Sequence, residues 1–179
     1  MSATLSSGNR YPGFTLAELL ISLVILGVIA IFTIPKILAT SQNAAYTSEY
    51  KEAQGIVSAA YVNYAAQNGY STNTTFGAIT PYLNYVSTST TASIDDVTGA
   101  GGWGCGGTRM CFYLHNGSVL DIDITTSFGS TNGTIRVFFD PDGVYSGTTN
   151  GAGKAQDFYL YYNGRVDSAA HGFASWYVP

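Results

Sequence analysis

A single charged side chain, Glu18, lies inside the most apolar stretch of the chain. Residues 14–34 contain no other charged residue, and their length is close to the roughly 20 residues with which a helix crosses the hydrocarbon core of a membrane. A carboxylate in that core costs at least about 2.5 kcal/mol, so an intramembrane Glu normally has a partner and a function. The chemistry to explain is therefore an ion pair made by Glu18.

The residues around this stretch indicate how Glu18 is used. The preceding 13 residues are polar, carry Arg10 and end in Gly13. They do not form a secretory signal, because no separate apolar region with a small-residue cleavage site follows the charged end. The apolar stretch begins Phe14-Thr15-Leu16-Ala17-Glu18, contains Gly27 and ends at Ile34-Pro35. With these residues the segment resembles the start of the type IV pilins, a superfamily that includes the pseudopilins of type II secretion systems.

The resemblance implies a processing and assembly pathway. Prepilin peptidase would cleave between Gly13 and Phe14, the new Phe14 amine would be methylated, and the mature subunits would enter a helical filament. Glu18 would pair with the Phe14 amine of a neighbour, which offsets part of the cost of burying both charges; Gly27 and Pro35 complete this assembly segment. The alternative is a plain single-pass anchor in which Glu18 reaches the membrane interface through its flexible stem.

The composition agrees with an exported subunit. Charged residues make up only 10% of the chain, and removal of the leader leaves six basic against 11 acidic residues, a formal charge of −5. This balance argues against nucleic acid as a partner. The 166 residues after Gly13 are enough for one helix and one small globular domain.

Helical signals continue past Pro35 and end at Asn68-Gly69, a typical helix stop. We predict a helix over residues 14–67, about 80 Å long, with weak points at Gly27 and Pro35. The chain divides into a leader (1–13), an apolar membrane or filament-core helix (14–35), the amphipathic second half of that helix (36–69), a variable segment (70–108), and a sheet domain with the C-terminal tail (109–179).

Turn signals predict an antiparallel sheet in the last part of the chain. Three Asn-Gly pairs, at 116–117, 132–133 and 163–164, suit the positive φ angles of two-residue hairpins. Alternation such as Leu120, Ile122 and Ile124 predicts a sheet with one buried face. We expect strands at 109–115, 118–124, 134–139, 157–162 and 165–166. Packing of this β-meander on the second half of the long helix gives an α+β, pilin-like fold.

Two cysteines, Cys105 and Cys111, enclose five residues. In an exported domain they are expected to form a local disulfide, which contributes about 2 kcal/mol for so short a loop. A metal pair is the weaker alternative, because the only other soft-metal ligands, His115 and His171, do not have zinc-site spacing.

One loop offers hard oxygen ligands for Ca²⁺. Asp140, Asp142, Asn150 and Asp157 lie in and just after it, and Ca²⁺ takes six to eight oxygens, backbone carbonyls included. The loop is not an EF-hand, because Gly151 stands where the bidentate Glu is required. The same residue types also form turns without any ion, so both interpretations stay open.

Three functions follow. The first, implied by the resemblance, is a structural subunit of a type IV pilus, a homo-oligomer that meets prepilin peptidase and the inner-membrane assembly machinery before it reaches the cell surface. The second is a minor pilin or a periplasmic pseudopilin of a type II secretion system. The third is a bitopic membrane enzyme or binding protein. No acid and base pair, Ser-His-Asp arrangement or cofactor motif supports an enzyme, so we predict no catalysis and no cofactor beyond the possible Ca²⁺.

Overall fold

The computed structural model describes residues 13–92, 104–143 and 155–168. One long helix, α1 (Leu16–Asn68), is followed by a six-stranded antiparallel sheet. The α+β class predicted from the sequence is therefore confirmed. Two compact units, residues 1–41 and 42–179, divide α1 between them.

Local hydrogen bonds fix both ends of α1. The backbone N–H of Glu18 donates to Oγ1 of Thr15 (3.3 Å), and the backbone N–H of Thr15 donates to the Glu18 carboxylate (2.8 Å), which is the reciprocal arrangement of a capping box. At the other end Gly69 has a φ of 79°, and its N–H donates to the carbonyl of Ala65. Glycine adopts this conformation without strain. The helix therefore spans 16–68, close to the predicted 14–67.

The segment predicted as variable contains short elements. They are α2 (Phe76–Ile79), η1 (Thr80–Tyr82) and β1 (Ser87–Ser89). The N–H of Gly77 donates to the carbonyl of Ile124 (2.8 Å), and a Cβ at position 77 would lie only 2.9 Å from that oxygen. Only glycine allows this close approach, which ties α2 to the connection that follows the third strand.

The sheet is a meander in which each strand pairs with the next one along the chain. Its order is β1, β2 (Arg109–Tyr113), β3 (Val119–Asp123), β4 (Thr134–Asp140), β5 (Gln156–Tyr161) and β6 (Val166–Ser168), with the 3₁₀ helix η2 (Phe128–Thr131) before β4. The predicted strands are found with shifts of one or two residues at their ends. Strand β1 was not predicted, because Ser-Thr-Ser carries no apolar alternation.

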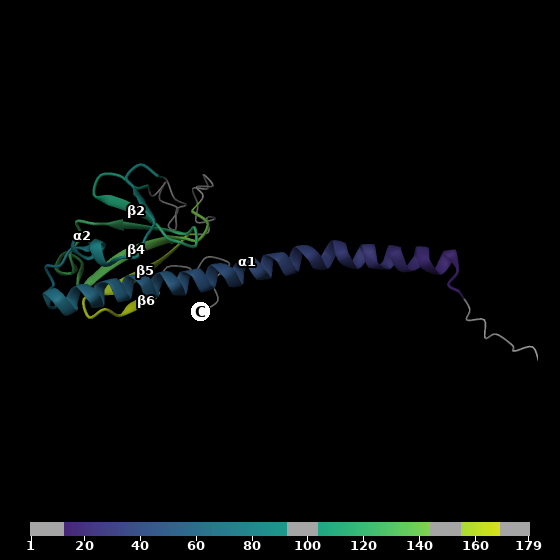
Figure 1. Cartoon of the computed structure of the whole chain (residues 1–179), viewed down its shortest axis with the longest axis horizontal. Helices are drawn as coiled ribbons and strands as arrows, with labels where there is room; N and C mark the ends of the chain where they lie inside the picture. The colour runs from purple at the N-terminus through teal and green to yellow at the C-terminus, as the bar shows by residue number, and fades with distance from the viewer. Residues whose placement is uncertain (1–12, 93–103, 144–154, 169–179) are drawn as a thin grey trace, which may run out of the picture. The chain divides into compact units, whose positions relative to one another are not determined.

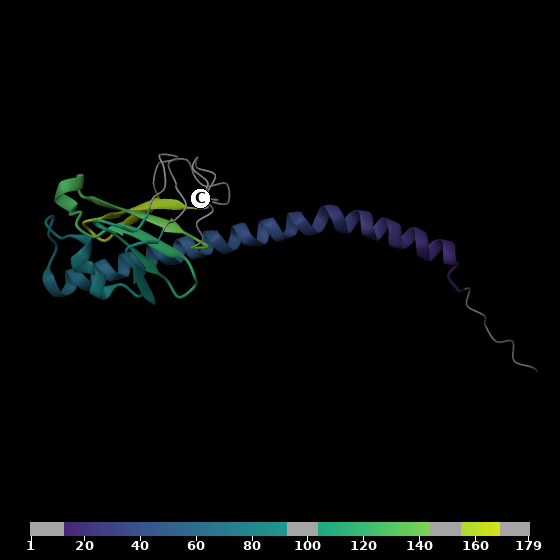
Figure 2. The ribbon, with the colours of Figure 1, turned by 90° about the horizontal axis from the view of Figure 1, so that it is seen from above.

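The second half of α1 packs on one face of the sheet, as Figures 1 and 2 show and as the sequence predicted. Tyr50 is central to this core. Its ring meets the rings of Phe139 and Phe158 edge-on at 5.6 and 5.7 Å, and its hydroxyl donates to the backbone carbonyl of Asp157 (2.8 Å). A hydroxyl this deeply buried needs such a partner.

Two details of the sequence prediction are wrong. Among the Asn-Gly pairs only Asn132-Gly133 has a positive φ at both residues (55° and 88°), and this pair ends η2 rather than closing a two-residue hairpin. At the other two pairs the side-chain oxygen of the Asn instead accepts a hydrogen bond from the backbone N–H two residues later. Asn116 accepts from Ser118, and Asn163 accepts from Arg165. This turn chemistry is an ordinary alternative for Asn.

The prediction of a sheet with one buried face is the second error. On the face opposite α1, a smaller apolar cluster buries Cys111, Val119 and Phe138 together with Cys105. Asp121, which the alternation placed on a polar face, is fully buried there. The middle of the sheet is therefore covered on both faces.

Candidate functional site: the apolar segment and the charged face of the sheet

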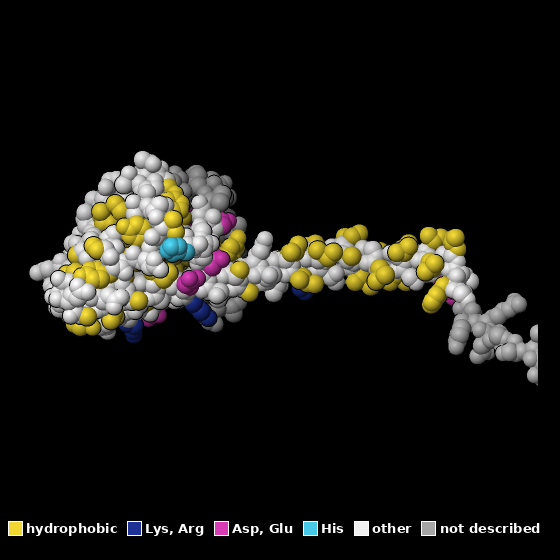
Figure 3. Space-filling model, in the orientation of Figure 1, with side chains coloured by type: hydrophobic (Ala, Val, Ile, Leu, Met, Phe, Trp, Pro, Cys, Tyr) yellow, Lys and Arg dark blue, Asp and Glu magenta, His cyan; other side chains and the backbone are white. Residues whose placement is uncertain are grey.

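The first half of α1 exposes its apolar side chains. From Phe14 to Leu38 the large exposed apolar residues are each more than half accessible, and Figure 3 shows them along this part of the helix. A helix that is apolar all round suits lipid or other apolar chains rather than water. Within the described residues α1 is the one helix long and apolar enough to cross a membrane.

Glu18 stands in the first turn of this segment. One oxygen of its carboxylate, Oε2, accepts hydrogen bonds from the backbone N–H and the hydroxyl of Thr15, both at 2.8 Å. Within the described part of the chain no hydrogen bond reaches the second oxygen, Oε1. The local contacts thus fix the direction of the carboxylate and leave it one oxygen for a further donor.

Gly27 and Pro35 lie inside the continuous helix. A Cβ at Gly27 would meet nothing within 4 Å, so nothing within the described chain requires glycine there. Small residues allow close approach between neighbouring membrane helices. Pro35 lacks the N–H that would bond the carbonyl of Ile31, yet the structure keeps helical geometry across it.

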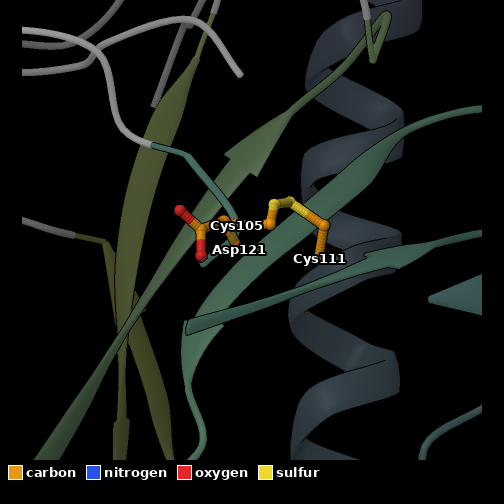
Figure 4. A group of neighbouring side chains, drawn as sticks. All are labelled: Cys105, Cys111 and Asp121. Atoms are coloured by element: carbon orange, nitrogen blue, oxygen red, sulfur yellow. A yellow bond between two sulfur atoms is a disulfide. The ribbon is translucent and has the colours of Figure 1, made fainter. Parts of the chain in front are cut away.

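The structure joins Cys105 and Cys111 by a disulfide, with their Cα atoms 5.4 Å apart. Asp121 lies beside it on the neighbouring strand (Figure 4), and these three side chains are the one group of metal-ligand type among the described residues. Sulfurs bonded to each other are not thiolate ligands, and Asp121 is paired with Arg109. His115 instead lies 3.2 Å from the amide oxygen of Asn84, and His171 falls outside the described residues.

Two ion pairs are built into the outer face of the sheet, the face opposite α1. Nη2 of Arg109 lies 2.8 Å from the carboxylate of Asp121, and Nε of Arg136 lies 2.5 Å from that of Asp157. Both carboxylates are fully buried, whereas both arginine side chains are partly exposed. Burial raises the pKa of Asp121, and the hydrogen bonds and charge of Arg109 oppose that rise.

Phe138 connects the two pairs. The guanidinium of Arg109 lies 4.6 Å from the centroid of its ring, and that of Arg136 lies 4.4 Å from it. Guanidinium groups are attracted to aromatic rings at such distances. The register explains the arrangement, because Phe138 stands directly between Asp121 and Asp157 across β3, β4 and β5.

The residues predicted for Ca²⁺ are not gathered into one group in the described structure. One carboxylate oxygen of Asp140 accepts the N–H groups of Asp142 (3.3 Å) and Gly143 (3.2 Å), as a turn former does. Asp157 is paired with Arg136, and Asn150 lies outside the described residues. Calcium binding at this loop stays a prediction.

A carboxylate on α1 that the sequence analysis missed faces two others. Burial raises the pKa of Glu49, and the charges of Glu52 and Asp142 raise it further. One of its oxygens is buried and accepts no hydrogen bond from any residue that the structure describes. Glu49 and Glu52 are close in sequence, but only the fold brings Asp142 near them.

Comparison with known proteins identifies the N-terminal segment. The family described as the prokaryotic N-terminal methylation motif matches residues 8–34. This motif is the signature of type IV pilins and pseudopilins, and it supports a protein of that class whose precursor is anchored in the membrane. The class is structural rather than enzymatic, and its members are processed by prepilin peptidase and handled by membrane assembly machinery. Neither the search of curated proteins nor that of solved structures found a match.

Proposed function

We propose that the chain is a structural subunit of a type IV pilus, released for assembly by cleavage between Gly13 and Phe14. The observation that carries the proposal is the apolar first half of α1, which is exposed on all sides in the single chain and begins with one carboxylate. Such a surface is stable only in lipid or among like helices. The membrane supplies the lipid, and a helical filament of identical subunits then supplies the like helices.

In this proposal Glu18 binds the N-terminus of the adjacent subunit. The open oxygen of its carboxylate receives the methylated Phe14 amine of the adjacent subunit, and the pair enters the filament core together. Breaking such a pair leaves one buried charge without compensation, which costs about 3–5 kcal/mol. Gly27 allows close helix contact, and Pro35 marks a place where α1 can bend or unwind, because one backbone hydrogen bond is already missing there.

The processing step is tested by the mass of the mature N-terminus. We expect a chain that begins at methylated Phe14 in cells with prepilin peptidase, and an uncleaved chain when Gly13 is replaced by a bulky residue (Gly13→Leu). The change Gly13→Ala is the matched control, and cleavage should persist there. Cleavage of Gly13→Leu at the normal rate would contradict recognition at this residue, and an uncleaved wild-type chain would favour the plain anchor.

The final location of the processed subunit distinguishes a pilus subunit from a pseudopilin or minor pilin. Processed subunits in long filaments sheared from the cell surface would support the pilus. Processed subunits that stay in the cell envelope would contradict it in favour of a pseudopilin or minor pilin.

A further inference from the structure

The turn between β2 and β3 contains an Asn-Gly pair, Asn116-Gly117, whose side-chain amide is held on both sides. Its oxygen accepts hydrogen bonds from the backbone N–H of Ser118 (3.1 Å) and from the hydroxyl of Ser118 (2.7 Å). Its nitrogen donates to Oε2 of Glu52 on α1 (3.2 Å). Because a backbone N–H can only donate, the amide atom that faces Ser118 is the oxygen, and the nitrogen therefore faces the carboxylate.

An Asn side chain that precedes glycine can react with its own backbone. The backbone nitrogen of Gly117 attacks Cγ of Asn116, a succinimide ring closes, and the Cγ–Nδ2 bond breaks. The proton that the Gly117 nitrogen loses is balanced by the proton with which Nδ2 departs as ammonia. Water then opens the ring and leaves aspartate, or isoaspartate when it attacks the backbone carbonyl carbon. Glycine hinders the attack least, because it has no side chain.

The contacts of Asn116 match the charges that this reaction develops. Negative charge builds up on the amide oxygen during the attack, and two donors already lie at that oxygen, as in an oxyanion hole. Oε2 of Glu52 lies beside the departing nitrogen, where a carboxylate can relay the proton that ammonia needs. Asn116 is also exposed, so water can reach the ring. These contacts favour both the attack and the departure of ammonia.

The other Asn-Gly pairs that the structure describes lack this set of contacts. The amide oxygen of Asn163 accepts one hydrogen bond, from the backbone N–H of Arg165. The nitrogen of Asn68 donates to the carbonyl of Tyr64, and the side chain of Asn132 makes no hydrogen bond to any described residue. One more pair, at 150–151, lies outside the described residues.

The attacking nitrogen is also held most weakly at Asn116. The N–H of Gly117 donates to the carbonyl of Leu114 at 3.2 Å. The corresponding distances at Gly69, Gly133 and Gly164 are 2.8, 2.7 and 2.9 Å. This bond must break before the nitrogen can attack, so the longest of the four is the easiest to give up.

Reaction at Asn116 would change the contact between the turn and α1. A hydrogen bond to Glu52 would be replaced by two carboxylates that face each other, and like charges repel at this range. The charges of Glu52 and Asp142 already raise the pKa of Glu49 in the same part of the domain. A further carboxylate there adds to a negative charge that is already unfavourable.

We propose that Asn116-Gly117 is a self-modification site, which converts to aspartate and isoaspartate in the folded chain and thereby loosens the β2–β3 turn from α1. The chain itself supplies the nucleophile, the donors and the carboxylate, and the solvent supplies the water.

The test is incubation of the full chain in detergent micelles at mildly alkaline pH, followed by peptide mapping with mass spectrometry. We expect Asn116 to convert at least about threefold faster than Asn68, Asn132 and Asn163, because one hydrogen bond to a developing charge changes a rate by about two- to tenfold. Equal rates, or a faster conversion at any of these three, would overturn the proposal. The same chain in concentrated urea is the control, and there the four pairs should react at similar rates. A preference for Asn116 that persists in urea would overturn its assignment to contacts of the fold.

Two matched variants test the donors at the amide oxygen. Ser118→Ala removes the hydroxyl and should slow the conversion of Asn116 about two- to tenfold. Thr134→Ala is the control, because Thr134 is likewise the second residue after the Asn of a pair, but its hydroxyl donates to the carbonyl of Thr131. It should leave the rate at Asn116 unchanged. An unchanged rate in Ser118→Ala would contradict the role of the hydroxyl, and the ranking in the wild-type chain decides the proposal even if this variant fails to fold.

Discussion

The two halves of α1 have opposite relations to their surroundings. Between Phe14 and Leu38 large apolar side chains are exposed, whereas between Tyr50 and Ala65 apolar residues are buried against the sheet. The sheet domain also buries the carboxylates of Asp121 and Asp157, each of which is paired with an arginine. The second half of α1 is therefore satisfied within one chain, and the first half requires lipid or other subunits. In the function that we propose, one continuous helix serves folding at one end and assembly at the other.

The largest expected effect is a loss of filaments caused by a change in the first half of α1. Glu18→Ala removes the carboxylate that we assign to pairing with the neighbouring amine, so the variant should be cleaved and membrane-inserted but should form almost no filaments. Sheared filaments are measured by electron microscopy and immunoblotting. Glu52→Ala is the control, because Glu52 is an exposed carboxylate on the half of α1 that packs on the sheet. Normal filaments from Glu18→Ala would remove the basis of the assembly role.

The next largest effect is expected on the stability of the sheet domain. Arg136→Met leaves Asp157 fully buried without its cation, and removal of one partner of a buried pair costs about 3 kcal/mol. Urea unfolding of the full chain in detergent measures the loss. The double change Arg136→Met and Asp157→Leu should recover most of it, since no lone charge remains. If the double variant is no more stable than the single one, the pair is not the cause.

The disulfide offers a smaller test of the same domain. Replacement of Cys105 and Cys111 by serine should lower the free energy of unfolding by about 2 kcal/mol, the contribution expected for a loop this short. A reducing agent should shift the urea midpoint of the wild-type chain and leave that of the variant unchanged. A wild-type midpoint that does not respond to reduction would show that the bridge is absent or contributes nothing.

The smallest expected effect is a pH-dependent change in stability at Glu49, in the half of α1 that packs on the sheet. The pKa of Glu49 is raised above its ordinary value of 4.5 by burial and by Glu52 and Asp142. Its ionised form therefore destabilises the folded state at neutral pH, and this cost disappears as the pH falls through the folded pKa toward 4.5. Glu49→Gln should stabilise the chain at about pH 7 and have no effect at about pH 4. A difference that is equal at both pH values would contradict this origin.

The apolar segment, the long helix and the five later strands could be predicted from the sequence because they depend on local patterns, whereas the short elements α2, η1, β1 and η2 were not predicted. The apolar run from Leu19 to Ile34, the helix stop at Asn68-Gly69 and the presence of turns at the Asn-Gly pairs each depend on a few neighbouring residues, although the geometry of those turns was predicted wrongly. The charged outer face could not be predicted in the same way. Its pairs join Arg109 to Asp121 and Arg136 to Asp157 across strands, and the alternation of side chains sets which face a residue occupies but not the register that decides its neighbour.

The contacts of Phe138 depend on the same long-range information. Arg109 and Arg136 come from β2 and β4, and nothing in their spacing along the chain indicates that both guanidiniums lie over the ring of Phe138. Burial of Asp121 also ran against the simple expectation for an Asp in an alternating strand, because the nearby Arg109 compensates its charge.

The most direct test of the central claim is a cryo-electron microscopy map of filaments sheared from cells that produce this chain, resolved well enough to place Phe14 and Glu18. We predict a filament core made of the first half of α1, with the Phe14 amine of one subunit within salt-bridge distance of the Glu18 carboxylate of another. A filament in which Glu18 faces solvent, or in which the sheet domains alone make the contacts, would contradict it.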